Sequence, residues 1–154
     1  MTAKINVEYV SSASELPAEA MISRWAQAAL EGYEGDVEVG VRIVDESEIT
    51  ELNQRFRKKA EPTNVLSFPF EDPPGTQTNV LGDVVVCAPI VSSQAQMEGK
   101  PLSAYWAQMV VHGIMHLRGY DHETRKRRVP WSIWKRVSSE VWAFPIPMPR
   151  VNAR

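Results

Sequence analysis

Hydrophobic and polar residues alternate along two segments of the chain, a period of two residues that is typical of half-buried strands. The first segment covers residues 5–9, and the second covers residues 37–43, where four aliphatic residues alternate with polar residues or glycine. Short apolar runs at residues 65–68 and 81–87 indicate two further strands. We therefore expect a sheet of four strands.

In two of the segments between these strands, apolar residues recur at the spacing of an amphipathic helix. The first helix is expected to begin near Pro17, which suits a first turn, and to end near Gly32. The second helix follows Asp45 or Ser47, and either residue can cap its N-terminus. The residues of this second helix that are expected to point inward are Ile49, Leu52 and Phe56.

Two more helices are expected in the second half of the chain. A short one covers residues 89–96, and a longer one covers residues 104–117, which are apolar on nearly every side. A helix of this kind must be buried on most of its surface. The order of elements predicts an α+β domain, with a small four-stranded mixed sheet, packed helices and a central buried helix.

Composition and charge narrow the class of protein only slightly. The hydrophobic share of 44% is ordinary for a globular domain. The sequence contains no segment that is long and apolar enough to span a membrane and no apolar region of a signal peptide, so we expect the cytoplasm. Cys87 is the single cysteine. It ends an apolar run, and we expect it to be a small buried hydrophobic residue.

The charge is unevenly distributed along the chain. Residues 1–123 contain 9 Lys/Arg and 18 Asp/Glu, whereas residues 124–154 contain 8 Lys/Arg and one acidic residue. Basic residues cluster at 55–59 and 125–128. Such clusters usually lie on solvated surface, and a role in phosphate binding requires that they face the active site.

All three histidines lie within an eleven-residue stretch, at positions 112, 116 and 122. On a helix, His112 and His116 project from one face because they are four residues apart. Gly119 can end that helix and turn the backbone before His122. Three imidazoles with an open fourth position are typical of catalytic zinc. We therefore predict one zinc ion per chain, bound by His112, His116 and His122, although each histidine could instead pack on its own.

The same histidine spacing occurs in the metzincin peptidases, whose pattern is H-E-x-x-H-x-x-G-x-x-H. In those enzymes, a glutamate after the first histidine is the general base, but this chain has Gly113 there. A zinc peptidase therefore remains an alternative that lacks its usual base. A second alternative is a non-catalytic ribosome-assembly factor that zinc merely stabilises.

Three motifs in chain order resemble the YbeY family of bacterial metallo-endoribonucleases. They are L-N-Q-R-F-R at residues 52–57 with P-T-N-V-L-S-F-P at 62–69, L-G-D-V at 81–84, and H-G-I-M-H-L-R-G-Y-D-H at 112–122. The resemblance implies a zinc-dependent endoribonuclease that is specific for single-stranded RNA. It further implies a role in 16S rRNA 3′-end maturation and ribosome quality control, with ribosomal particles as partners.

The resemblance also assigns site residues. It implies that His112, His116 and His122 bind the zinc and that Arg57 is the catalytic or phosphate-binding arginine. Such a guanidinium could hold a phosphate through two hydrogen bonds and stabilise the negative charge of the transition state. Asp83 also matches a motif position, and we expect it to have a turn-forming or hydrogen-bonding role.

The family pattern disappears near residue 125, so we expect one metallo-endoribonuclease domain at residues 1–124 and an atypical tail at residues 125–154. Tryptophans crowd into this tail, and its charge is opposite to that of the domain. In a neighbouring reading frame, the same region can encode the acidic helix and the ending that the family has. We interpret the tail as a possible frameshift product; the alternative is a divergent tail that is helical over residues 131–142.

Overall fold

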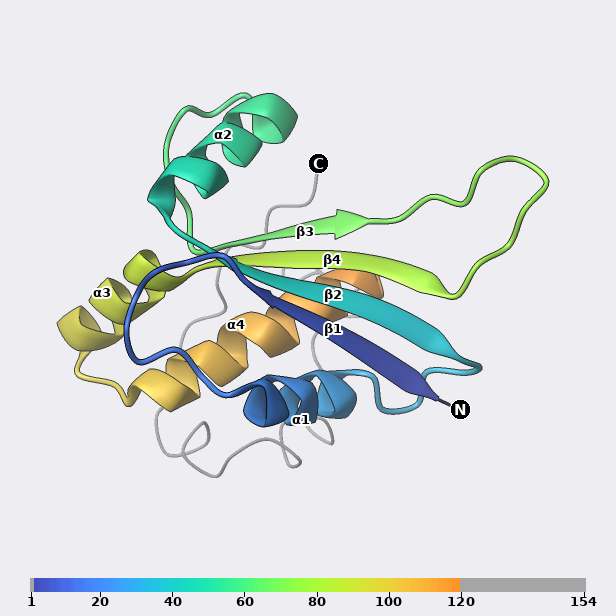
Figure 1. The fold of residues 1–154 in the computed structure, drawn as a ribbon, viewed down its shortest axis with the longest axis horizontal. Coiled ribbons are helices and arrows are strands. Elements are labelled where there is room, and N and C mark those ends of the chain that lie inside the picture. Colours follow the sequence, from blue (N-terminus) through green and yellow to red (C-terminus); the bar gives the residue numbers. More distant parts are fainter. Residues whose placement is uncertain (1, 120–154) are drawn as a thin grey trace.

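A computed structural model describes residues 2–119 of the chain, and within them it shows four strands and four helices (Figure 1). In chain order they are β1 (Ala3–Tyr9), α1 (Glu19–Ala29), β2 (Val37–Val44), α2 (Glu46–Arg57), β3 (Val65–Pro69), β4 (Val80–Cys87), α3 (Ala88–Glu98) and α4 (Leu102–Leu117). The predicted order of elements is confirmed. His122 and the tail at residues 125–154 lie outside the described residues.

The four strands form one mixed sheet in the order β1-β2-β4-β3. The first three strands in this order are parallel, and β3 runs antiparallel to β4 at one edge. Parallel neighbours require crossover connections, which α1 provides between β1 and β2. A long loop at residues 70–79 joins β3 to β4 and extends beyond the sheet (Figure 1). The α+β class with a mixed sheet is confirmed.

The main core lies between the sheet and helices α1 and α4, which run beside each other along one face (Figure 1). The alternating aliphatic residues of β2 point into this core, together with Trp25 from α1 and Trp106 from α4. All residues of α4 are buried except Leu102, Ser103 and His116. The prediction of a central buried helix is therefore confirmed, and no helix within residues 2–119 is long and apolar enough to cross a membrane.

Helix α2 packs on the opposite face of the sheet, mainly beside β4 and β3. A second, smaller core fills this contact. Its buried members are Val44, Ile49, Leu66, Val85 and Cys87. The thiol of Cys87 is fully buried, and burial raises its pKa to about 11. The prediction that Cys87 is a small buried hydrophobic residue is confirmed.

The structure corrects two details predicted for α2. Asp45 occupies the N-cap position, but its carboxylate makes no capping bond and instead accepts hydrogen bonds from Ser11 and Ser12. Phe56 was expected to point inward, yet it is 48% exposed. Its ring contacts Phe68 edge to face, with centroids 5.1 Å apart, at the rim of an open groove. Helical spacing indicated the direction of Phe56 but not that the groove beside it is open.

Gly82 in β4 provides a test of this packing, because its φ of +151° disfavours any other residue. A Cβ atom there would lie 2.4 Å from the carbonyl oxygen of Phe68 and 2.8 Å from a side-chain carbon of Leu117. We expect Gly82→Ala to lower the free energy of unfolding by roughly 2–5 kcal/mol, since backbone strain adds to overpacking. Chemical denaturation measures this loss.

Gly75→Ala is the matched control for this substitution. Gly75 also has a positive φ, of 79°, but a Cβ atom there has no neighbour within 4 Å. Only the strain of the left-handed backbone remains, and it costs about 1–2 kcal/mol. Equal losses for the two variants would show that the contacts of Gly82 with β3 and α4 are not as tight as the structure indicates.

Candidate functional site

His112 and His116 lie one turn apart on the C-terminal half of α4. His112 is 4% exposed and His116 is partly buried, although the helix around them is almost entirely apolar. The helix ends where Gly119 adopts a φ of +92° and its N–H donates to the carbonyl of His116 at 3.0 Å. The predicted turn after the second histidine is therefore present. His122, the third predicted ligand, lies three residues beyond the last described position.

The backbone between these two histidines lies directly against the sheet. The hydroxyl of Ser67 on β3 donates to the carbonyl of Gly113 at 2.9 Å, and this contact is buried. A Cβ atom at position 113 would lie only 2.5 Å from Cγ1 of Val84 on β4. The residue after the first histidine therefore faces the sheet, and there is no room for a side chain.

The donor chemistry of α4 fits zinc. Imidazole nitrogen is a common zinc ligand, and two histidines four residues apart can bind one ion. Within residues 2–119, no group of three or more His, Cys, Asp or Glu residues is arranged to hold a metal ion. His122, the third predicted ligand, lies outside these residues.

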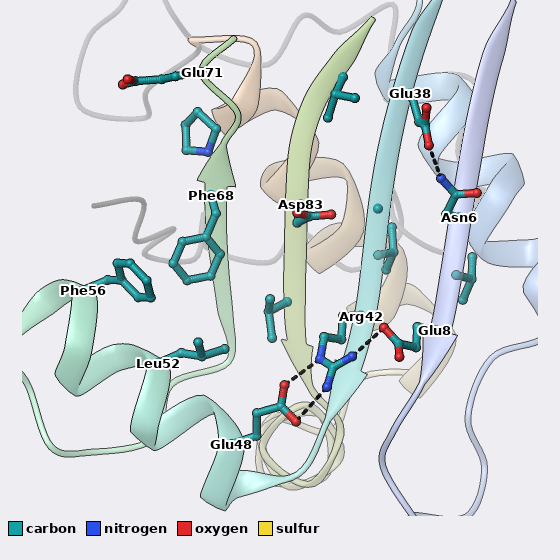
Figure 2. A pocket seen from close by; sticks show the side chains of 16 residues that line it. Asn6, Glu8, Glu38, Arg42, Glu48, Leu52, Phe56, Phe68, Glu71 and Asp83 are labelled. Atoms are coloured by element: carbon teal, nitrogen blue, oxygen red, sulfur yellow. Dashed lines mark hydrogen bonds and ion pairs between the residues drawn. The ribbon is translucent and has the colours of Figure 1, made fainter. Parts of the chain in front are cut away.

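A groove of about 810 Å³ opens on the other face of the sheet, next to α2 (Figure 2). One end is apolar and is formed by Leu52, Phe56, Phe68 and Val85. The rest is formed mainly by polar residues on the open face of the strands and on the neighbouring elements. These polar lining residues are Asn6, Glu8, Glu38, Arg42, Glu48, Glu71 and Asp83.

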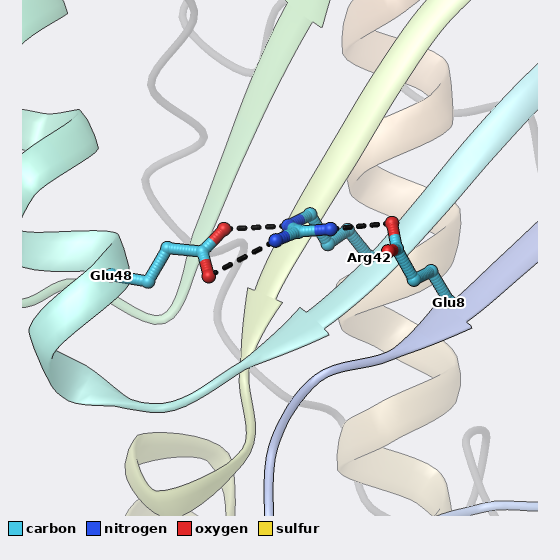
Figure 3. A network of polar contacts seen from close by, with 3 residues as sticks. All are labelled: Glu8, Arg42 and Glu48. Carbon is cyan, nitrogen blue, oxygen red and sulfur yellow. Dashed lines mark hydrogen bonds and ion pairs between the residues drawn. The ribbon is translucent and has the colours of Figure 1, made fainter.

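Arg42 lies between two carboxylates on the floor of this groove (Figure 3). It donates to Glu8 on β1 and makes a two-bond contact with Glu48 on α2. These hydrogen bonds, the one to Glu48 first, raise the pKa of the guanidinium. Arg42 thus joins β1, β2 and α2, and its positive charge is already engaged by two carboxylates.

The groove as a whole is acidic. Its described lining contains five carboxylates but one basic side chain, Arg42. Like charges repel strongly where solvent is partly excluded. The groove therefore disfavours an RNA phosphate backbone, because its carboxylates lie on the open face of the sheet (Figure 2).

Asp83 lies at the centre of this groove, with its carboxylate above Gly40 of the neighbouring strand (Figure 2). A Cβ atom at position 40 would overlap the carboxylate oxygen, so glycine is needed there to accommodate Asp83. Burial raises the pKa of Asp83, and the negative charges of Glu38 and Glu8 raise it further. The turn-forming or hydrogen-bonding role expected for this residue stays a prediction.

Arg57 is the last residue of α2, and the left-handed Lys58 ends the helix after it. It is partly buried and does not belong to the described lining of the groove. The helix of Arg57 and the helix of the histidines lie on opposite faces of the sheet and share β3 as a neighbour. On this edge strand, Phe68 contacts α2, whereas the preceding Ser67 contacts α4. Within the described residues, the edge strand β3 therefore lies between the two helices.

Comparison with known proteins identifies the family of this chain. The family model described as "Endoribonuclease YbeY" matches residues 5–130. The chain belongs to the YbeY endoribonuclease family. YbeY-type endoribonucleases are hydrolases that cleave RNA, so RNA is the substrate class of this chain. The match ends at residue 130, which leaves residues 131–154 of the expected tail outside it.

A solved structure supports the YbeY assignment at the level of the fold. The chain resembles the solution structure of TM1509 from Thermotoga maritima, with 30% sequence identity and a TM-score of 0.55. The similarity covers 92% of this chain and 90% of TM1509.

Sequence reasoning did not anticipate the acidic groove of this YbeY protein. The signal was present in the outward positions of the two alternating strands. Asn6, Glu8, Glu38 and Arg42 are all polar, and Gly40 interrupts them where Asp83 needs space. Alternation alone indicates only a solvated face, because it does not reveal which helix borders that face.

The raised pKa of Asp83 predicts a pH-dependent effect on stability. Because the pKa in the folded state lies above the ordinary value, the ionised carboxylate destabilises the fold at neutral pH. This penalty disappears as the pH falls through the raised pKa and the group binds a proton. We therefore expect Asp83→Asn to raise the free energy of unfolding at neutral pH and to have little effect in acid.

Chemical denaturation of the variant and of the unsubstituted chain, from acid to neutral pH, measures the difference in their free energies of unfolding. Glu34→Gln is the control, because Glu34 is exposed and lies outside the groove. This variant should show no comparable gain in the free energy of unfolding at neutral pH. A destabilising effect of Asp83→Asn at neutral pH would show that the carboxylate makes a favourable contact there.

Proposed function

We propose that this chain is a zinc-dependent endoribonuclease that cleaves single-stranded RNA in the cytoplasm and acts in 16S rRNA 3′-end maturation and ribosome quality control. The observation that carries the proposal is the pair His112 and His116 on a buried helix of a YbeY-family chain, with a left-handed glycine after the pair. Ribosomal particles are the proposed partners. Metal dependence, strand specificity and the rRNA substrate rest on this family assignment.

His112, His116 and His122 are the proposed zinc ligands. When bound, zinc would supply a Lewis acid that lowers the pKa of a water molecule to about 7, so that hydroxide is available at neutral pH. The protein contributes the rigid helix that carries two of the imidazoles. Rigid support of this kind keeps ligands close to their productive geometry.

Arg57 is the proposed catalytic residue that binds the scissile phosphate. It lies in a basic cluster at the end of α2, where Arg55, Lys58 and Lys59 are exposed. Positive charge is favourable at the C-terminal end of a helix and attracts an RNA backbone. RNA that follows the edge strand β3 would contact this cluster and the α4 histidines together and would avoid the acidic groove.

The zinc peptidase alternative loses support from the position of Gly113. In peptidases with this histidine spacing, the residue after the first histidine carries the general base. Here that position faces β4, and even a Cβ atom would overlap Val84. The ribosome-assembly alternative, in which zinc is only structural, is tested by cleavage of RNA.

We expect Arg57→Ala to reduce RNA cleavage on the order of 10²–10³-fold while zinc content stays unchanged, because it removes one electrostatic contact with the transition state. Arg57→Lys should recover only part of the rate, since an ammonium cannot form the same pair of hydrogen bonds to phosphate. His116→Ala should lose both zinc and cleavage. Metal analysis and a cleavage assay on single-stranded RNA measure these effects.

Arg55→Ala is the matched control, because Arg55 lies on the same helix and is exposed. A guanidinium nitrogen of Arg55 lies 3.7 Å from a carboxylate oxygen of Glu51. This variant should weaken RNA binding slightly and leave the maximal rate unchanged. A fully active Arg57→Ala variant would show that Arg57 is not catalytic. A cleavage-competent protein without zinc would overturn the proposed metal dependence.

A further inference from the structure

We propose that Ser67 is a positioning residue for the metal site, because its hydroxyl fixes the rotation of α4 and thereby the directions of His112 and His116. The proposal deepens the proposed function and rests on it. Ser67 lies on the edge strand β3, 46 positions before the carbonyl of Gly113 that accepts its hydrogen bond. It does not belong to the ligand set or to the basic cluster.

The environment of Ser67 indicates that its hydroxyl has a directional role. The residue is fully buried, and Val65 on the same face of β3 belongs to the main apolar core. Serine is rarely buried in such surroundings, and an apolar residue could fill the space. The carbonyl of Gly113 lies within α4 and therefore accepts a helical hydrogen bond as well. The bond from Ser67 is thus an additional link between the sheet and the helix.

The hydrogen bond acts together with the contact between Gly113 and Val84. The missing side chain at Gly113 lets the backbone of α4 approach β4, which sets the height of the helix above the sheet. Hydrophobic burial alone does not select one rotation of a helix that is apolar on nearly every side, because the hydrophobic effect is non-directional. The hydrogen bond from Ser67 to the carbonyl of Gly113 is directional, so it favours one rotation of α4 at this residue.

Helix geometry shows why this rotation matters for the histidines. Successive residues are about 100° apart around a helix axis. Relative to the sheet-facing Gly113, His112 and His116 therefore lie about 100° and 60° away, both on the same side. They project sideways from the contact with the sheet, so any rotation of α4 moves both imidazoles in the same sense.

The test compares Ser67→Ala with Val65→Ala in the full chain. Val65→Ala removes buried volume from the same face of the same strand but leaves the hydrogen bond intact. Zinc affinity is measured by competition with a chromophoric chelator, and ligand geometry by the visible spectrum of the cobalt-substituted protein. We expect Ser67→Ala to weaken zinc binding by about 10-fold, the lower end of the range for a group bonded directly to a metal ligand, and to alter the cobalt spectrum. Val65→Ala should lower stability and change neither readout.

Ser67→Cys is a second variant in case Ser67→Ala does not fold. Its thiol fills the site but is a weak donor, so it should also weaken zinc binding. Unchanged affinity and an unchanged cobalt spectrum in a folded Ser67 variant would overturn the positioning role while leaving the proposed function intact. Failure of the unsubstituted chain to bind zinc would overturn the zinc-dependent function and this inference together.

Discussion

The close contact between α4 and the sheet at Gly113 is the constraint on which the site depends. The helix is apolar on nearly all sides, so burial alone explains why it lies in the centre of the domain. Burial does not explain why one particular side of the helix faces β4. The absence of a side chain at Gly113 and the hydrogen bond from Ser67 determine that side. The directions of the two histidines follow from it.

The two faces of the sheet have different chemistry as a consequence. On the α4 face, the strands contribute aliphatic residues to a continuous core, and His116 is among the few residues of α4 that are not buried. On the other face, α2 covers only part of the sheet and leaves an acidic groove around Arg42 and Asp83. Because RNA carries negative charge, we propose that its path is separate from the groove. The cationic end of α2 at Arg57 and the edge strand β3 are the proposed contacts for the substrate.

Much of this architecture could be predicted because its signals are local. Alternation marked β1 and β2, an all-round apolar run marked α4, and Gly119 marked its end, where the backbone does turn. The bond between Ser67 and Gly113 could not be predicted, since it joins residues 46 positions apart and a serine in a strand has no distinctive pattern. The exposure of Phe56 was missed for a related reason. Helical periodicity gives the direction of a side chain but not the extent of the surface that covers it.

The comparison with peptidases of identical histidine spacing shows how one motif can serve two chemistries. The spacing of ligands is set by the period of the helix, which is the same in every protein. The position after the first histidine lies on a neighbouring side of the helix, and in the peptidases that side faces the substrate. In this chain the same side is pressed against Val84. The surface that carries the peptidase base is therefore used here to attach the helix to its sheet. An endoribonuclease built this way must stabilise charge with a group from another element, and Arg57 on α2 is the proposed group.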